Sequence, residues 1–238
     1  AEKKSAYFDS PAFLLPLLRL AEEREVGHFY YCSSGGAIYG DQPARVCTED
    51  SAVRPVSNYG IGKAEAENLI REFATQNSVK TVCWRFGNVY GPGQNPKASQ
   101  GLVAVAVDSL INRVPLKVFG DGSRVRDYVY VDDASSAAAK TVGFDSVRDV
   151  YNVGTRVGHS VEQVLRVVEN VVGGSIRRRQ VGDPPSQVQS IVLDNSLIQE
   201  EFGPLPFRSL EDGVSDYAEF LFHGPQSGMA RPRERHKT

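Results

Sequence analysis

A tyrosine and a lysine stand four positions apart in the segment Tyr-Gly-Ile-Gly-Lys, residues 59–63. If a helix begins here, Tyr59 and Lys63 share one of its faces, so the ammonium can lie near the phenol. A phenol with its ordinary pKa of about 10 is a poor base at neutral pH, but a neighbouring positive charge lowers that pKa. The pair could therefore take a proton from a hydroxyl group. The spacing alone is a weak signal, because a surface pair without a chemical role shows the same pattern.

A second polar segment, Cys-Ser-Ser-Gly-Gly-Ala-Ile-Tyr-Gly at residues 32–40, follows a short aromatic run. It predicts a buried strand that ends in a glycine-relaxed loop. Ser33 and Ser34 would then lie at the strand tip, where open α/β sheets usually bind their ligands. Two interpretations stay open: the hydroxyls reach a substrate or cofactor, or they only satisfy loop amides.

Strand and helix signals alternate along the chain and predict an α/β fold. Strands are predicted at 28–33, 79–86, 116–119, 128–131, 151–153 and 190–193. Helices are predicted from a Ser10-Pro11 cap, with a kink or later start at Pro16, and over 59–76, 100–113, 134–143, 160–172, 195–201 and 209–222. The first strand, helix and strand are typical of a parallel crossover.

Composition excludes several classes of protein. The 238 residues are 41% hydrophobic and carry a formal net charge of -2, which gives no field for nucleic acid or an anionic membrane. Cys32, Cys47 and Cys83 form no CxxC pair, which argues against disulfides and a zinc site, so no metal is expected. No apolar run approaches the roughly 18 residues of a membrane span. We expect a soluble, cytoplasmic protein.

A series of motifs resembles the extended short-chain dehydrogenase/reductases that modify nucleotide sugars, the NAD-dependent epimerase/dehydratase family around UDP-glucose 4-epimerase. The motifs are Ser33-Ser34 with Tyr39-Gly40, Pro55 to Lys63 with Glu67, Arg85 to Pro92, Phe119 to Gly122, Arg126 to Asp133, and Tyr151 to Gly154. They span about residues 28–154, with a weaker match to about 222. The resemblance implies a partial Rossmann-like parallel sheet with a smaller C-terminal substrate lobe.

The same resemblance implies a division of the chain. Residues 1–115 would form the C-terminal part of a Rossmann-like NAD-binding domain. Residues 116–223 would form mainly a nucleotide-sugar-binding lobe, with returning Rossmann elements. The polar and basic residues 224–238 are expected to be a disordered tail.

On the cofactor side, the resemblance makes Tyr59 the acid/base and Lys63 the residue that holds the nicotinamide ribose of NAD and lowers the tyrosine pKa. Phe86 would pack against the cofactor, and Ser33 would line its site. Ser34 is the candidate catalytic hydroxyl, because the family normally carries Ser or Thr where this chain has Gly35.

On the substrate side, Asn88 and Arg126 would contact the diphosphate, Phe119 would lie near the nucleotide base, and Asp183 would contact the nucleotide ribose. Arginine suits a diphosphate because its planar fork donates two parallel charge-assisted hydrogen bonds. The alternative for Arg126 is a surface salt bridge to Asp127 or Asp133.

The implied reaction is C4 epimerisation of a nucleotide sugar, with a UDP-hexose the expected substrate. Tyr59 would remove the 4-hydroxyl proton while NAD takes the hydride, and the transient ketone would rotate before the hydride returns. The alternatives are a reductase or dehydratase of the family, or a catalytically inactive nucleotide-sugar-binding subunit. Dehydratases carry Thr-Asp-Glu where Gly35, Gly36 and Ala37 stand here, which favours epimerisation. A homodimer is expected through two helices, one of which carries Tyr59.

The sequence of the N-terminal part of the chain differs from the family's pattern. A dinucleotide site needs a glycine-rich turn between its first strand and helix, and an acidic residue after the second strand. Residues 1–30 contain neither pattern. The chain would be either a fragment of a longer epimerase-like protein or a natural short form without the cofactor half. The presence of Tyr59, Lys63 and Phe86 favours the fragment.

Overall fold

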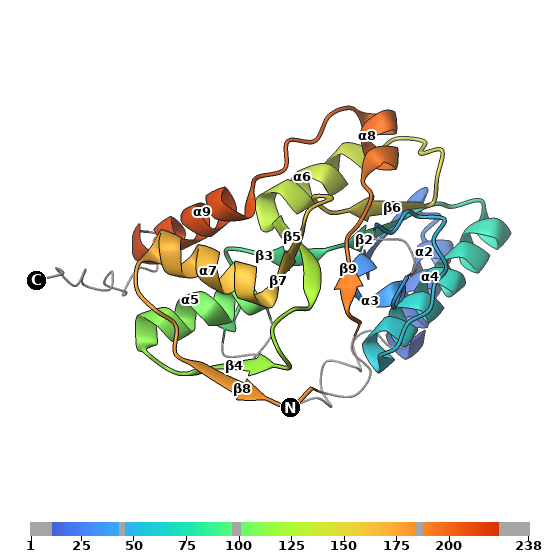
Figure 1. Cartoon of the computed structure of the whole chain (residues 1–238). Helices are drawn as coiled ribbons and strands as arrows, with labels where there is room; N and C mark the ends of the chain where they lie inside the picture. Colours follow the sequence, from blue (N-terminus) through green and yellow to red (C-terminus); the bar gives the residue numbers. More distant parts are fainter. Residues whose placement is uncertain (1–10, 43–45, 97–100, 184–187, 224–238) are drawn as a thin grey trace, which may run out of the picture.

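The computed structural model describes residues 11–42, 46–96, 101–183 and 188–223, as an alternation of strands and helices (Figure 1). The strands are β1 (His28–Ser34), β2 (Lys80–Phe86), β3 (Asn88–Tyr90), β4 (Leu116–Phe119), β5 (Val125–Tyr130), β6 (Val150–Val153), β7 (Gly158–Ser160), β8 (Arg178–Val181) and β9 (Ser190–Ile191). The helices are α2 (Pro11–Glu23), α3 (Gly35–Ile38), α4 (Asn58–Asn77), α5 (Leu102–Asn112), α6 (Val131–Thr141), α7 (Val161–Val172), α8 (Ser196–Phe202) and α9 (Leu210–His223). The predicted tail at 224–238 and the Ser10 cap lie outside the described residues.

A parallel sheet of order β1-β2-β6 confirms the predicted α/β fold. Cys32 of β1 is in register with Trp84 of β2, and Ser34 with Phe86. The carboxyl ends of the two strands therefore meet at one edge of the sheet, where parallel sheets place their ligand sites.

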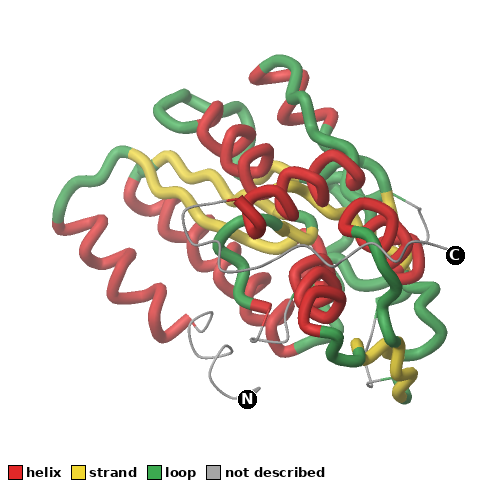
Figure 2. The backbone as a smooth tube through the Cα atoms, turned by 90° about the vertical axis from the view of Figure 1, so that its left-hand side faces the viewer, coloured by secondary structure: helices red, strands yellow, loops and turns green. Residues whose placement is uncertain are grey.

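Helices cover both faces of this sheet (Figure 2). Alternate strand residues point to opposite faces. Phe29, Tyr31 and Cys83 pack with α2 and α4. On the other face Trp84 packs with α6 and α8, and its ring stacks on Tyr30 at a centroid distance of 5.4 Å. The sheet and α4 are thus fixed together by apolar burial, the main favourable contribution to folding.

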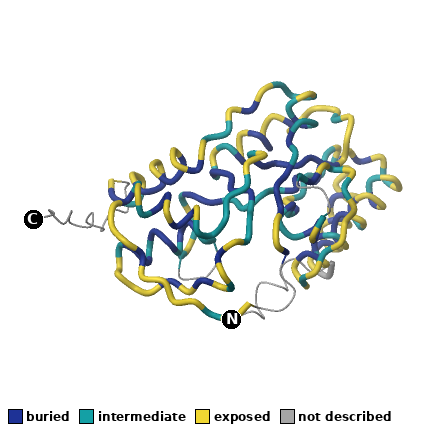
Figure 3. Tube along the Cα trace, viewed as in Figure 1, coloured by how far each residue is buried: buried dark blue, intermediate teal, exposed yellow. Residues whose placement is uncertain are grey.

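The C-terminal half has a separate core. β3, β5, β7 and β9 form a mixed sheet, and β4 pairs with β8. Helices α5, α7 and α9 pack against one another and against the tyrosines of β3 and β5. Figure 3 shows the inward sides of these helices buried and their outward sides exposed.

Several predicted boundaries were wrong for local reasons. The segment expected to be a loop after β1 forms the one-turn helix α3. In this helix Gly35 lies against Leu193 and Gly36 against Asn88, with no room for a side chain at either glycine. The strand expected at 128–131 begins at Val125 and ends at Tyr130. The later helix start at Pro16 is wrong, because α2 runs from Pro11 to Glu23 with Pro16 inside it.

A buried ion pair joins α4 to β2. Arg85 Nη2 lies 2.6 Å from Glu67 Oε2, and the two side chains are only 4% and 3% exposed. Ser33 Oγ of β1 donates to Glu67 Oε1 over 2.5 Å. Burial would lower the pKa of Arg85, but the Glu67 hydrogen bond and the nearby Tyr39 raise it well above its ordinary value. The Arg85 guanidinium therefore remains charged inside the fold.

The polar network continues from this pair toward β6. Arg85 Nη1 donates to Tyr39 Oη over 3.0 Å, and Tyr39 Oη donates to Asn152 Oδ1 over 2.7 Å. Burial raises the pKa of Tyr39 far above the ordinary phenol value, so it stays a neutral donor. The network thus links β1, α3, α4, β2 and β6 in one arrangement.

A glycine allows α4 to touch α3. A Cβ built on Gly60 would fall on the carbonyl oxygen of Ala37 and would lie 3.0 Å from Pro55 Cβ. Only a residue without a side chain allows this approach, which sets how near the first turn of α4 lies to the end of β1.

Across the described residues, none of the helices combines the length and apolar character that crossing a membrane requires.

We expect Glu67→Gln to lower the free energy of unfolding by about 3–5 kcal/mol, because it leaves the Arg85 charge buried without its partner. The matched control is Asp149→Asn, which removes the exposed ion pair with Arg71, whose side chains are 51% and 49% exposed. That change should cost no more than about 1 kcal/mol. Urea unfolding measures both, and equal effects would contradict a special role for the buried pair.

Gly60→Ala should destabilise the protein by about 1–3 kcal/mol, although alanine is the better helix former, because the added methyl overpacks the α3 contact. Gly27→Ala is the control, since a Cβ at Gly27 meets nothing within 4 Å. Chemical denaturation of both variants tests this expectation. A Gly60→Ala protein as stable as the control would show that the helices can move apart freely.

Candidate active site

The first turn of α4 presents Tyr59 beside the carboxyl edge of the parallel sheet. Ser57 starts the helix, because its Oγ accepts a hydrogen bond from Gly60 N over 3.1 Å. Tyr59 is the second residue of the helix after this cap and is 42% exposed. The phenol is therefore accessible to a ligand while its backbone is fixed.

Lys63 lies one turn later and is almost completely buried, with 7% of its surface exposed. Its Nζ donates to Cys32 O over 3.0 Å. The same Nζ lies 5.6 Å from the centroid of the Tyr59 ring and 4.8 Å from that of Tyr31. The structure thus brings the ammonium to the tyrosine, as the four-residue spacing predicted.

The two serines of β1 point to different surroundings. Ser33 is buried and donates to Glu67, so its hydroxyl belongs to the polar network rather than to a loop amide. Ser34 is half-buried, and its Oγ lies 3.9 Å from the position that a Cβ on Gly36 would take. Asn88 Oδ1 lies 2.9 Å from the same position. Ser34 and Asn88 therefore flank Gly36 together.

Position 35 faces the core. A Cβ on Gly35 would lie 2.6 Å from Leu193 Cδ1 and 3.1 Å from Arg85 O. A serine or threonine there would collide with this buried leucine before it could reach a ligand. Of the two neighbouring positions, Ser34 is therefore the one that can offer a hydroxyl.

Phe86 ends β2 directly opposite Ser34. Its ring is partly buried in the core cluster beneath the sheet, 6.3 Å from the ring of Trp84. Ser34, Phe86 and Asn88 thus come from adjacent strand ends, and Tyr59 and Lys63 approach the same strands from α4.

Arg126, one of the residues predicted on the substrate side, is the second residue of β5. Its guanidinium donates to Val125 O and Val188 O, each over 2.7 Å. Burial lowers the pKa of Arg126. The alternative salt bridge is wrong, because Asp127 accepts from backbone amides and Asp133 pairs with Arg208.

Phe119 and Asp183 lie at the end of the two-stranded β4-β8 sheet. Phe119 is exposed and in register with Val181. Asp183 pairs with Arg124, and a Cβ on Gly120 would meet its carboxylate. Gly120, with φ of +66°, thus allows the acidic side chain to approach the strand end.

Sequence reasoning missed Asp127, the buried carboxylate next to Arg126. It accepts hydrogen bonds from Thr155 N over 2.8 Å, from Thr155 Oγ1 over 2.7 Å and from Leu193 N over 3.1 Å. Burial raises its pKa although these hydrogen bonds act in the opposite direction. The sequence feature that could have pointed to Asp127 is its place in the motif Arg126-Asp127-Tyr128.

A cavity of about 310 Å³ was also missed. Its lining includes Tyr128, His159 and Arg208. His159 is the strand partner of Arg126, so the cavity opens beside that arginine. Burial raises the pKa of Tyr128 to about 12, so the phenol is a neutral hydrogen-bonding group.

The residues at the carboxyl edge of the parallel sheet fit the nicotinamide ribose end of a dinucleotide better than its pyrophosphate. Tyr59 and Lys63 offer a phenol and an ammonium beside the strand ends. A pyrophosphate needs glycines that leave room for it. Gly35 and Gly36 are instead packed against Leu193 and Asn88. Within the described ranges, no group of three or more His, Cys, Asp or Glu could hold a metal ion.

Comparison with known proteins identifies the family of the chain. The family model described as "NAD dependent epimerase/dehydratase family" matches residues 6–154. A UDP-glucose 4-epimerase of Mycolicibacterium smegmatis is 32% identical over 221 residues, which are 90% of this chain and 69% of that protein.

Solved structures of similar proteins agree as well. The UDP-glucose 4-epimerase of Thermotoga maritima with UDP-glucose has a TM-score of 0.82 at 33% identity, covering 87% of this chain and 67% of that one. The Thermus thermophilus UDP-glucose 4-epimerase complex with NAD has a TM-score of 0.80 at 30% identity, covering 86% and 67%. The chain thus spans about two thirds of these relatives. With the buried lysine held against the tyrosine at the sheet edge, these matches show that the chain belongs to the NAD-dependent epimerase/dehydratase family.

Proposed function

We propose that this chain acts as an NAD-dependent nucleotide-sugar 4-epimerase, with a UDP-hexose as substrate. The observation that carries the proposal is the buried Lys63 ammonium, 5.6 Å from the ring of the accessible Tyr59. The similar proteins named with UDP-glucose and with NAD support the choice of substrate and cofactor.

In this proposal Tyr59 exchanges the proton of the sugar 4-hydroxyl. The neighbouring ammonium of Lys63 would stabilise the negative charge that the phenol oxygen gains in this transfer. Ser34 donates to or accepts from the sugar oxygen, and Phe86 packs beside the cofactor. NAD, when bound, supplies the acceptor and donor of hydride.

The substrate side is proposed to hold the nucleotide diphosphate through Arg126 and Asn88. Arg126 now donates only to neutral carbonyl oxygens. Phosphate oxygens would replace these carbonyls with charged acceptors, which form stronger hydrogen bonds. Phe119 offers an exposed ring for the base, and Asp183 a carboxylate for the ribose. Residues 116–223 would thus form most of the substrate lobe, and 1–115 the cofactor side.

A dehydratase is less well supported by the site. Removal of a C5 proton needs a carboxylate near the sugar, and Gly36 instead lies against Asn88. A glutamate or aspartate at Gly36 would displace that amide.

The cytoplasmic location stays a prediction from the sequence.

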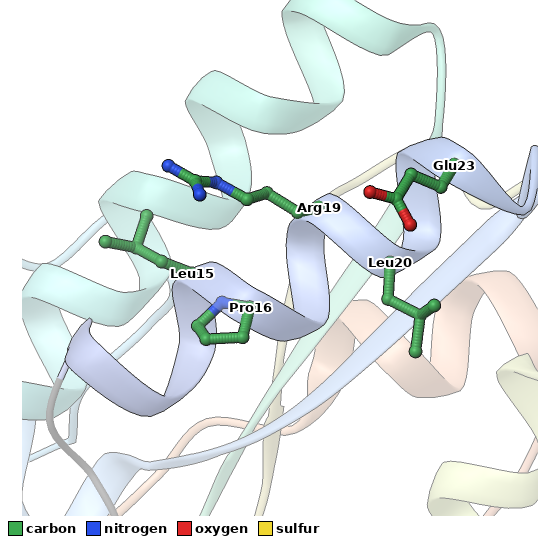
Figure 4. A pocket seen from close by; sticks show the side chains of 5 residues that line it. All are labelled: Leu15, Pro16, Arg19, Leu20 and Glu23. Carbon is green, nitrogen blue, oxygen red and sulfur yellow. The ribbon is translucent and has the colours of Figure 1, made fainter.

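The proposed partner is a second copy of the chain, which would pack on α2. This helix exposes Phe13, Leu15, Leu17 and Leu20, although its other side is packed on α4. Figure 4 shows Leu15 and Leu20 on the outside of the helix, at a hollow lined also by Pro16 and Arg19. Ile61 adds an exposed apolar side chain on α4.

We expect Tyr59→Phe to lower kcat for interconversion of UDP-glucose and UDP-galactose by about 10²–10⁴, with little change in KM, because only the proton transfer is lost. Product analysis with added NAD, including the N-acetyl sugars, measures this. Tyr30→Phe is the control, since that phenol lies on the other face of the sheet and accepts a hydrogen bond from Gly143 N. A wild-type protein that interconverts no nucleotide sugar, or a fully active Tyr59→Phe variant, would contradict the proposal.

Leu17→Glu should convert a dimer to a monomer, because it places a charge in the apolar contact of α2. Val147→Glu is the control, since Val147 is exposed in the loop before β6. Sedimentation velocity at several concentrations distinguishes the two states. A monomeric wild-type protein, or a Leu17→Glu dimer as tight as the control, would rule out this interface.

A further inference from the structure

The ring of Tyr31 lies nearer to the Lys63 ammonium than the ring of Tyr59 does. The Nζ lies 4.8 Å from the Tyr31 centroid, against 5.6 Å for Tyr59. Both distances are within the roughly 6 Å over which a cation is attracted to an aromatic face. The ammonium therefore lies between two tyrosine rings, one from β1 and one from α4.

This arrangement compensates a buried charge. An ammonium with 7% exposure has lost most of its hydration, which is costly unless polar or aromatic groups replace the water. Cys32 O supplies one hydrogen bond of 3.0 Å. Tyr31 and Cys32 are consecutive in β1, and β1 is fixed along its whole length to β2. The rigid strand thus supports Lys63 on the side away from the helix.

We infer that Tyr31 is a positioning residue, whose ring holds the Lys63 ammonium beside Tyr59. The inference rests on the proposed function, in which that ammonium stabilises the Tyr59 phenolate. Without the Tyr31 ring, the flexible four-carbon chain of Lys63 has a weaker anchor and can turn toward solvent. The phenolate then loses part of its stabilisation, and proton transfer becomes slower at neutral pH.

The titratable groups near Lys63 in the described part of the chain include the Cys32 thiol, whose pKa is raised by burial against the opposing effect of Lys63. Glu67, one turn further along α4, is engaged by Arg85 and Ser33. Tyr59 is the accessible titratable group that the Lys63 ammonium approaches.

The chain offers a matched control on the same face of β1. Phe29, two residues before Tyr31, packs edge-on against Phe73 at a centroid distance of 6.4 Å. Both residues belong to the core between β1, α2 and α4. A purely structural role of Tyr31 would therefore be reproduced by Phe29→Leu.

The test is a pH titration of phenolate absorbance, measured for each variant with and without Tyr59→Phe so that the difference reports Tyr59. Tyr31→Leu should raise the Tyr59 midpoint by about 0.5–1 pH unit. Tyr31→Met, whose flexible unbranched side chain also lacks the ring, should do the same and serves if Tyr31→Leu does not fold. Tyr31→Phe, which keeps the ring, and Phe29→Leu should leave the midpoint within about 0.2 unit.

In the epimerisation assay, Tyr31→Leu should lower kcat at neutral pH by about three- to tenfold with KM nearly unchanged, and should shift the pH profile upward as the midpoint shifts. Equal midpoints in Tyr31→Leu and wild type, or equal shifts in Tyr31→Leu and Phe29→Leu, would overturn the inference. Failure of the proposed function gives a different result: no epimerisation in any variant, while the titration is still interpretable.

Discussion

The buried pair of Arg85 and Glu67 is the interaction on which the site depends. Two charges at 4% and 3% exposure cost more to bury than their attraction returns unless every other polar atom is satisfied. Ser33, Tyr39 and the Glu49 carbonyl supply those partners. Such a pair contributes less to stability than to choosing a single packing of α4 on the sheet. That packing determines where Tyr59 and Lys63 lie.

Close contacts made by glycine refine this placement. Gly60 lets α4 approach α3, Gly36 leaves space for the Asn88 amide, and Gly35 admits Leu193 beneath the strand tip. A methyl group would meet a backbone carbonyl oxygen at Gly60, and the end of a side chain at Gly36 and Gly35. The segment after β1 is therefore a spacer between the sheet and the helix. It leaves Ser34 as the hydroxyl that can face a ligand.

The C-terminal half uses a buried carboxylate in a different way. Glu67 has a guanidinium as its partner, whereas Asp127 is satisfied by neutral N–H and O–H donors from Thr155, Arg156 and Leu193. A carboxylate without a countercharge is disfavoured by burial, which explains its raised pKa. Through Leu193, the same residue that packs on Gly35, Asp127 connects the proposed diphosphate side to the serine segment.

The sequence by itself determined the α/β alternation and the pairing of Tyr59 with Lys63, since both follow from local periodicity: strand alternation and a four-residue helical spacing. Alternation along a strand places Ser33 and Ser34 on opposite faces, but the sequence could not say which face is covered by α4 and which is open to a ligand. The partners of Arg126 and the ring of Tyr31 beside Lys63 were equally out of reach. These contacts join residues distant in the chain, and only the packing of α4 and β9 on the sheets brings them together.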